Sequence, residues 1–208
     1  MELFYDTETS DFYKDRLAFN HPKQSWVCQL AAILSDEDLI YAQISLYVKP
    51  YDRTISKNAE NVHGISVSMC EFAGMDESSV IGLFLNMARR ANTLVAHNVS
   101  FDQQFVESMI QRGLPDVKVS IYDFKHICTM KAGTPVCKLP PNFPGADHKW
   151  PKLEELYKYL FGEDLVDAHD AMADVKATRR CYYAMRKLPE CRGWFPPLTD
   201  AKKGVGKE

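Results

Sequence analysis

Runs of apolar residues predict five β-strands, three of them in the first quarter of the chain. Residues 2–6 form the first run. Residues 26–34 and 39–48 form the next two, and the polar turn Ser35-Asp36-Glu37-Asp38 between them predicts a hairpin. Shorter apolar runs at 93–96 and 120–124 predict the fourth and fifth strands.

Apolar residues at helical spacing predict the helices. Val80, Phe84 and Met87 recur on one face of a segment that Asp76 would cap and that runs to about residue 90. The other predicted helices are a short one after Ser68, and longer ones at 100–112, 152–161 and 170–187.

Two capping boxes mark helix starts. Ser68 with Glu71, and Ser100 with Gln103, place a serine three residues before an acid or amide that can bond back to the backbone of the cap. Gly113 would end the second of these helices, because glycine readily adopts the left-handed conformation of a C-cap.

The order of the elements predicts an α/β domain. Three consecutive strands followed by alternating helix and strand describe a mixed five-stranded sheet flanked by helices. Residues 133–150 contain four prolines and predict a long irregular loop. From residue 192 the chain is polar, so we expect one domain at 1–191 and a flexible tail at 192–208.

Composition narrows the class of protein. The chain has 208 residues, 46% of them hydrophobic, which is enough for one substantial core. The net charge of −3 provides no global basic field, so any attraction for nucleic acid must be local. The six cysteines lack disulfide or zinc spacing and suggest reduced thiols. Without a signal-peptide pattern or a run of ~18 apolar residues, we expect a cytoplasmic protein that has no membrane partner.

Four acids and one histidine stand at the ends of predicted elements. Asp6 and Glu8 are two apart at a strand end and can share a face. Asp102 falls in the first turn of a helix, where the dipole favours its ionised form. His169 is five residues before Asp174, too far to share a helical face. We therefore expect His169 in a loop and Asp174 one turn inside the last helix.

This set of side chains indicates phosphodiester chemistry. Carboxylates at the ends of apolar strands are costly to bury unless a cation compensates them. Four of them suit two hard divalent ions such as Mg²⁺, which prefer carboxylate oxygen. A histidine beside them is the natural general base for an attacking water. The pattern therefore predicts a nuclease.

Taken together, these residues resemble the DnaQ-like (DEDDh) 3′–5′ exonuclease family. The matching segments follow the family's order and span most of the chain, at 6–9, 29–33, 62–66, 96–102 and 169–174. One departure is Ser10-Asp11, where the family usually has Thr-Gly after the Asp-Thr-Glu-Thr motif. The acid motif is intact, but the turn that receives the terminal nucleotide differs in sequence.

The resemblance implies a ribonuclease H-like fold and a specific set of roles. Asp6, Glu8, Asp102 and Asp174 would bind two Mg²⁺ or Mn²⁺ ions, and His169 would be the general base. Residues at the substrate would be Thr7, Thr9, His63, Ile65, Asn98 and Phe101. The implied activity is a proofreading-type 3′–5′ exonuclease that releases nucleoside 5′-monophosphates from the 3′ end of DNA, with single-stranded or frayed ends preferred.

Several alternatives stay open from the sequence. Ile65 could line the nucleotide pocket or pack in the core, and Phe101 could stack on a nucleotide or anchor its helix. Asn98 could orient the metal ligands or only form a turn, and Trp150 is expected to pack against the helix that follows it. RNA could replace DNA as the substrate, because no residue marks a contact to the 2′-hydroxyl. A non-catalytic nucleic-acid-binding module is the other class, and no protein partner is indicated.

Overall fold

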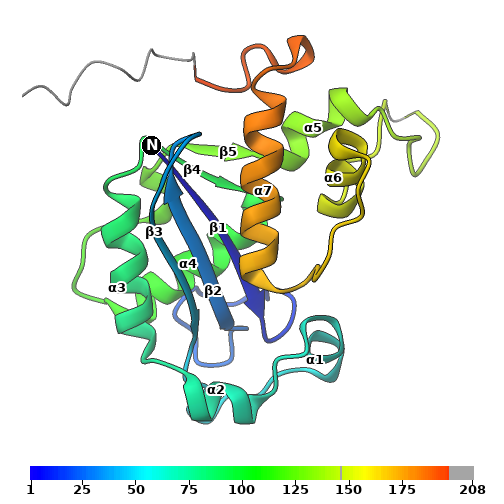
Figure 1. Cartoon of the computed structure of the whole chain (residues 1–208). Coiled ribbons are helices and arrows are strands. Elements are labelled where there is room, and N and C mark those ends of the chain that lie inside the picture. The colour runs from blue at the N-terminus through cyan, green and yellow to red at the C-terminus, as the bar shows by residue number, and fades with distance from the viewer. Residues whose placement is uncertain (146, 197–208) are drawn as a thin grey trace, which may run out of the picture.

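The computed structural model describes residues 1–145 and 147–196 and consists of a five-stranded sheet with helices on both faces (Figure 1). The strand order is β3-β2-β1-β4-β5, with β1, β2 and β3 antiparallel and with β4 and β5 parallel to β1. The strands are β1 (Glu2–Thr9), β2 (Val27–Ser35), β3 (Ile40–Tyr47), β4 (Thr93–Ala96) and β5 (His126–Cys128). The helices are α1 (Lys57–His63), α2 (Val67–Ala73), α3 (Glu77–Ala88), α4 (Val99–Gly113), α5 (Thr129–Cys137), α6 (Leu153–Phe161) and α7 (Ala171–Met185). The mixed five-stranded α/β sheet predicted from the sequence is confirmed.

Alternation along β1 determines which face of the sheet each side chain reaches. Tyr5 packs into the core that α3 and α4 cover, whereas Phe4 packs against α7 on the other face. Successive strand residues point to opposite faces, so Asp6 and Glu8 continue the α7 face and Thr7 continues the α4 face. The strand runs beyond the predicted residue 6 to Thr9. The acids are therefore held by regular strand geometry.

The hairpin of β2 and β3 forms where the polar turn predicted it. The Asp36 carboxylate accepts hydrogen bonds from the backbone N–H groups of Asp38 and Leu39, at 3.0 and 2.8 Å. This local bonding lets the chain reverse with few residues. β2 is buried along its whole length, while the edge strand β3 is largely exposed or half-buried.

Two helix starts differ from the predicted capping boxes. Ser66, not Ser68, caps α2 by accepting from the N–H of Met69 at 3.2 Å. α4 begins directly after Asn98, which has a left-handed φ of 64°, and Ser100 lies inside the helix. A serine three residues before an acid or amide allows a helix to begin there but does not require it. The left-handed turn at Asn98, by contrast, fixes where α4 begins.

The fifth strand is a second correction. Residues 120–124 were predicted as a strand, but Ile121–Asp123 form a 3₁₀ turn closed by the side chains of Ser120 and Asp123. These short polar side chains bond to the nearby backbone and compete with strand pairing. β5 follows at His126–Cys128, parallel to β4.

α1 and α5 were not predicted. α1 has no buried residue, so no apolar period marks it in the sequence. α5 takes up the first part of the predicted loop 133–150, and Pro135 lies inside the helix. Its inner face is buried against α6. A Cβ atom added at Gly133 would lie 2.8 Å from the Leu156 side chain, so the absence of a side chain at Gly133 allows this close packing.

The end of the domain lies beyond the predicted residue 191. The ring of Phe195 meets the buried ring of Tyr182 edge-on, with centroids 5.0 Å apart. Packing therefore continues into the segment that was expected to be a tail. Residues 197–208, the rest of that segment, lie outside the described residues.

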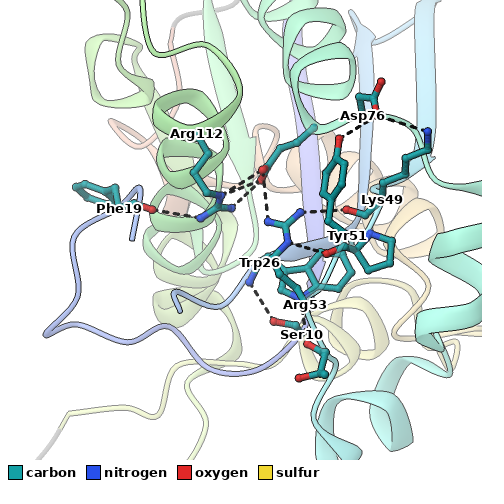
Figure 2. A network of polar contacts seen from close by, with 11 residues as sticks. Ser10, Phe19, Trp26, Lys49, Tyr51, Arg53, Asp76 and Arg112 are labelled. Carbon is teal, nitrogen blue, oxygen red and sulfur yellow. Dashed lines mark hydrogen bonds and ion pairs between the residues drawn. The ribbon is translucent and has the colours of Figure 1, made fainter. Parts of the chain in front are cut away.

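A buried ion-pair network fixes the loops beside the end of β1 (Figure 2). Glu77, only 7% exposed, accepts from Arg112 Nη2 at 2.7 Å and from Arg53 Nη1 at 3.4 Å. Arg112 also donates to the carbonyl of Phe19 at 3.2 Å. The guanidinium of Arg53 stacks on the buried ring of Trp26, 4.7 Å from its centroid. We call Glu77, Arg53 and Arg112 the arginine–glutamate network.

This network connects to the C-terminal end of β1. The backbone N–H of Trp26 donates to the hydroxyl of Ser10 at 3.0 Å, and Ser10 directly follows β1 (Figure 2). The carbonyl of Ser10 accepts from the N–H of Ser56, the residue that caps α1. The loops on both sides of the β1 terminus are thus tied to one buried acid.

Buried thiols and short helices agree with the composition. Every cysteine lies in the described part of the chain as a buried free thiol. Burial raises the pKa of Cys181 to about 12 and that of Cys137 to about 11, so both stay protonated and unreactive. Among the helices described, none is long and apolar enough to cross a membrane.

Candidate active site

Three carboxylates converge at the end of β1 on the face that α7 covers. One oxygen from each of Asp6, Glu8 and Asp174 lies within 4.8 Å of the other two. Asp6 and Glu8 are brought together by strand period, and Asp174 extends from the first turn of α7. We call these three residues the acid cluster. The structure thus brings together three of the four acids that the sequence singled out.

Asp102 approaches the same point from the opposite face of the strand. It lies in the first turn of α4, as predicted, and is 2% exposed. Its Oδ1 accepts from the backbone N–H of Thr7 at 3.0 Å and from the Thr7 hydroxyl at 2.8 Å. The fourth acid is therefore locked to β1 between Asp6 and Glu8, outside the acid cluster itself.

The acids destabilise one another's ionised forms. Burial, followed by the charges of Asp102 and Glu8, raises the pKa of Asp6 well above its usual range. Burial and the neighbouring carboxylates raise the pKa of Glu8 to about 8. Burial likewise raises the pKa of Asp102 to about 7 and that of Asp174 to about 6. Desolvated carboxylates that repel each other favour a cation between them.

A divalent cation fits the donors of the acid cluster. Asp174 Oδ1 is fully buried and has no hydrogen-bond partner within residues 1–145 and 147–196. Such an unsatisfied acceptor costs ~1–3 kcal/mol, which a ligated ion would remove. Carboxylate oxygens are the donors that Mg²⁺ and Mn²⁺ prefer. Asp6, Glu8 and Asp174 are the residues that can hold such an ion.

His169 stands beside this cluster in the loop before α7, as predicted. Its backbone has a left-handed φ of 70°, and its N–H faces Asp174 Oδ2 at 3.4 Å. Its Nε2 lies 3.7 Å from a carboxylate oxygen of Glu154, in the first turn of α6. The ring is half exposed, and the carboxylate of Glu154 lies beside it.

Two further histidines near the end of β1, His63 and His97, use both ring nitrogens in hydrogen bonds. His63 Nδ1 accepts from the N–H of Ile65 at 2.9 Å, and its Nε2 donates to the carbonyl of Thr9 at 3.2 Å. His97 contacts the Thr129 hydroxyl and the Pro151 carbonyl, both at 3.0 Å. Burial lowers the pKa of His97 to about 4. Neither ring has a nitrogen free to take a proton.

A small cavity opens next to Glu8. Its volume is about 210 Å³, and its lining comes from the end of β1, the loop after it, α1 and α4. Phe12 and Val62 stand at its edge, 80% and 57% exposed. We call this cavity the apolar pocket. The lining residues are Thr7, Glu8, Thr9, Asp11, Phe12, Asn58, Ala59, Val62, His63 and Phe101.

The structure separates the predicted substrate residues into two groups. Thr7, Thr9, His63 and Phe101 line the apolar pocket, although the Thr7 hydroxyl is used to hold Asp102. Phe101 also packs on Phe105, with ring centroids 5.0 Å apart, so it anchors its helix as well as lining the apolar pocket.

Ile65 and Asn98 lie elsewhere. Ile65 is 3% exposed and belongs to the main core, so the packing role is the one that the structure supports. Asn98 forms the left-handed cap of α4 and does not line the apolar pocket.

Sequence reasoning missed several residues of the site, Phe12, Asn58, Val62 and Glu154 among them. Phe12, Asn58 and Val62 line the apolar pocket, and Glu154 contacts His169. An aromatic residue in a polar loop shortly after the Asp-Thr-Glu-Thr motif was the available signal for Phe12. The others depend on α1 and α6 folding back on the strand end, which no local pattern indicates.

Comparison with known proteins agrees with this geometry. The family model described as exonuclease (RNase_T) matches residues 3–182. No curated protein matches the chain. Solved structures with the same fold include E. coli exonuclease I in complex with a dT13 oligonucleotide (TM-score 0.68, 24% identity, 89% of this chain and 41% of that chain). Another is a moderately thermophilic exonuclease I from Methylocaldum szegediense (TM-score 0.68, 21% identity, 90% and 40%).

The matched structures are longer proteins. This chain spans about two fifths of their length, so their likeness concerns one domain and shows its ribonuclease H-like fold. The family model covers nearly the whole described domain, including all four acids and His169. The chain belongs to the exonuclease family, within its DnaQ-like 3′–5′ group.

Proposed function

We propose that this domain is a metal-dependent 3′–5′ exonuclease that removes nucleoside 5′-monophosphates from single-stranded DNA. The observation that supports it most is the acid cluster, whose three carboxylates lie within 4.8 Å of one another without a compensating side chain among the described residues. Asp102, locked to Thr7, adds the fourth negative group. Four acids suit two Mg²⁺ or Mn²⁺ ions.

Each residue has one task in the proposed reaction. When bound, the divalent ions would neutralise the scissile phosphate and stabilise the charge that develops on the attacking and leaving oxygens. His169 takes one proton from a water molecule, whose oxygen forms the new bond to phosphorus. The bond to the 3′-oxygen of the preceding nucleotide breaks, and that oxygen gains a proton. Glu154 holds the His169 ring in position.

The apolar pocket suits the terminal nucleotide. It adjoins Glu8, so a base and sugar inside it would place the adjoining phosphate at the acid cluster. Phe12 and Phe101 provide the aromatic surfaces on which bases stack in single-strand binders. The pocket is too small for a base pair, which favours a single-stranded or frayed end. The complex of E. coli exonuclease I with an oligodeoxynucleotide supports DNA as the substrate.

The test is a cleavage assay on a 5′-labelled single strand. We expect a ladder of products shortened from the 3′ end with Mg²⁺ or Mn²⁺, and no cleavage with EDTA. The released product should be the 5′-mononucleotide, which chromatography separates from the 3′-mononucleotide. An intact strand that shifts in a gel would instead identify a non-catalytic binder. An RNA strand of the same sequence, cleaved faster than DNA, would identify an exoribonuclease.

A further inference from the structure

Trp150 is an exposed aromatic residue. It directly precedes Pro151, which contacts His97, and stands four residues before Glu154, which contacts His169. Its side chain is 58% exposed, so it does not pack against the following helix as the sequence suggested. Its neighbours Pro151 and Leu153 are buried and provide that packing instead. The indole is therefore held at the surface by an anchored segment, and its ring contributes little to the core.

Two contacts place this segment beside the active site. The carbonyl of Pro151 accepts from His97 at 3.0 Å, and His97 directly precedes the cap of α4, the helix that carries Asp102. Four residues after Trp150, Glu154 contacts His169 at 3.7 Å. Four residues span at most about 14 Å of chain, which is a distance of a few nucleotides along a single strand. Trp150 thus lies within reach of a strand whose end is at His169.

The surroundings of the ring are positively charged. The ammonium group of Lys131, on α5, lies over the ring at 5.9 Å from its centroid. Lys138, the C-cap residue of α5, and Lys152, two residues after Trp150, are exposed, and Lys149 is paired with Glu155 at 2.5 Å. Lysines that have no carboxylate partner within residues 1–145 and 147–196, beside an exposed aromatic ring, match the alternation of phosphate and base in a single strand.

We propose that Trp150 and Lys131 form a platform for the strand upstream of the scissile phosphate, with a base stacked on the indole and a phosphate paired with the ammonium group. The inference rests on the proposed function, since the occupant is the rest of the single-stranded substrate whose terminal nucleotide fills the apolar pocket. The platform makes binding depend on nucleotides that the chemistry itself does not touch. It would hold the shortened strand between one cleavage and the next.

The experiment compares a long substrate with one that cannot reach the platform. The first is single-stranded oligothymidylate, and the second is the p-nitrophenyl ester of thymidine 5′-monophosphate, which has no upstream nucleotide. Trp150→Ala should raise KM for the oligonucleotide about 5- to 100-fold, the value of one stacked base, with kcat nearly unchanged. Activity on the ester should not change. Trp150→Phe should keep most of the affinity, and Lys131→Ala should weaken the salt dependence of KM.

A matched control and a binding measurement make the outcome decisive. Trp194 is another exposed tryptophan, 43% accessible and distant in sequence from both contacts, so Trp194→Ala should leave both substrates unaffected. Anisotropy of a labelled oligonucleotide with Ca²⁺ measures binding apart from cleavage. Equal KM and equal affinity in Trp150→Ala and the parent protein would overturn the platform. If the parent protein binds the oligonucleotide through Trp150 but does not cleave it, the proposed function is overturned and the platform remains. If the parent protein neither binds nor cleaves the oligonucleotide, the proposed function and the platform are both overturned.

Discussion

The molecule buries acids in two places, which differ in the charges that surround the acid. In the arginine–glutamate network, Glu77 is 7% exposed and faces two guanidinium groups, at 2.7 and 3.4 Å. In the acid cluster, Glu8 is 8% exposed and faces Asp6 and Asp174 within 4.8 Å. The two glutamates are almost equally buried. Among the residues that the structure describes, Glu77 meets cations supplied by the fold, and Glu8 meets only further carboxylates.

This difference separates a structural acid from a functional one. Burying a carboxylate costs several kcal/mol unless an opposite charge accompanies it, so an uncompensated group of acids lowers stability. The network removes this cost within the chain and ties together the loops around residues 19 and 53. The acid cluster leaves the cost in place until an ion binds from solution. Carboxylates that are buried without a positively charged partner, and not buried carboxylates in general, therefore mark the candidate site.

The largest effect is expected from removing a carboxylate near the proposed metal ions. Asp6→Ala, Glu8→Ala, Asp102→Ala and Asp174→Ala should each lower kcat at least ~10³-fold at saturating Mg²⁺, because several kcal/mol of charge stabilisation are lost. Each variant should remain folded, with unfolding by urea as the measurement. Asp164→Ala is the matched control, since Asp164 is an exposed acid that pairs with Lys158 outside the acid cluster. Near-normal turnover in any two of the four alanine variants would refute the metal assignment.

The next effect in size concerns His169. His169→Ala should lower kcat about 10²- to 10⁴-fold, the usual contribution of a positioned proton acceptor. Mg²⁺ affinity measured by calorimetry should change little, because the imidazole contacts the water and not the ion. Free imidazole added to the variant should restore part of the rate. His97→Ala provides the comparison, and imidazole rescue of that variant instead would move the base to His97.

Breaking the arginine–glutamate network should lower the stability of the protein and leave its catalytic rate unchanged. Glu77→Ala leaves Arg53 and Arg112 without their buried partner and should lower the free energy of unfolding by about 3–5 kcal/mol. At a temperature where the variant stays folded, its kcat should remain close to that of the parent protein. Glu163→Ala removes a comparable pair with Arg180 that is exposed, and its stability should be nearly unchanged. A Glu77→Ala protein of normal stability would show that the network does not stabilise the loops.

The two regions also differ in how far the sequence could reveal them. The strand β1, the hairpin, and the placement of His169 and Asp174 follow from short-range rules of period, turn and cap, so the sequence predicted them. Motif order then joined acids that lie far apart in the chain. Nothing local connects Arg53, Glu77 and Arg112, so the network was invisible before the fold was known.

The remaining errors have the same physical origin. α1 buries no side chain and left no apolar period to find, and the 3₁₀ turn at 121–123 is decided by two polar side chains. Ile65 was expected at the nucleotide pocket or in the core, and Trp150 against the following helix. The structure places Ile65 in the core and Trp150 at the surface. For a single apolar residue outside a periodic element, only tertiary contacts decide which side faces solvent.

The smallest expected effect, measured over about one pH unit, is a pH dependence of stability that belongs to the acid cluster. The folded pKa of Glu8, about 8, lies above its ordinary value of 4.5, so the folded state binds more protons than the unfolded state between these values. Stability without metal should then be fully present below about pH 4.5 and fall as the pH rises to about 8, by up to ~1.4 kcal/mol per pH unit for each proton. Buried histidines such as His97 act in the opposite sense, but only below the ordinary histidine pKa of 6.5. The buried thiols lower stability in the same sense as the carboxylates, but only as the pH approaches their ordinary pKa of 9.0. Urea unfolding in EDTA between about pH 7 and 8 therefore reports mainly the carboxylates.

Glu8→Gln makes this measurement specific. The variant cannot ionise at position 8, so its stability in EDTA should equal that of the parent protein at low pH and exceed it increasingly toward pH 8. Saturating Mg²⁺ should remove most of the fall in the parent protein, because an ion that binds the folded state stabilises the ionised cluster. Glu77→Gln offers the contrast, since the arginines already compensate the charge that it removes. A parent protein whose stability in EDTA stays level or rises from about pH 7 to 8 would mean that the cluster is compensated within the fold, and the distinction between the two regions would be lost.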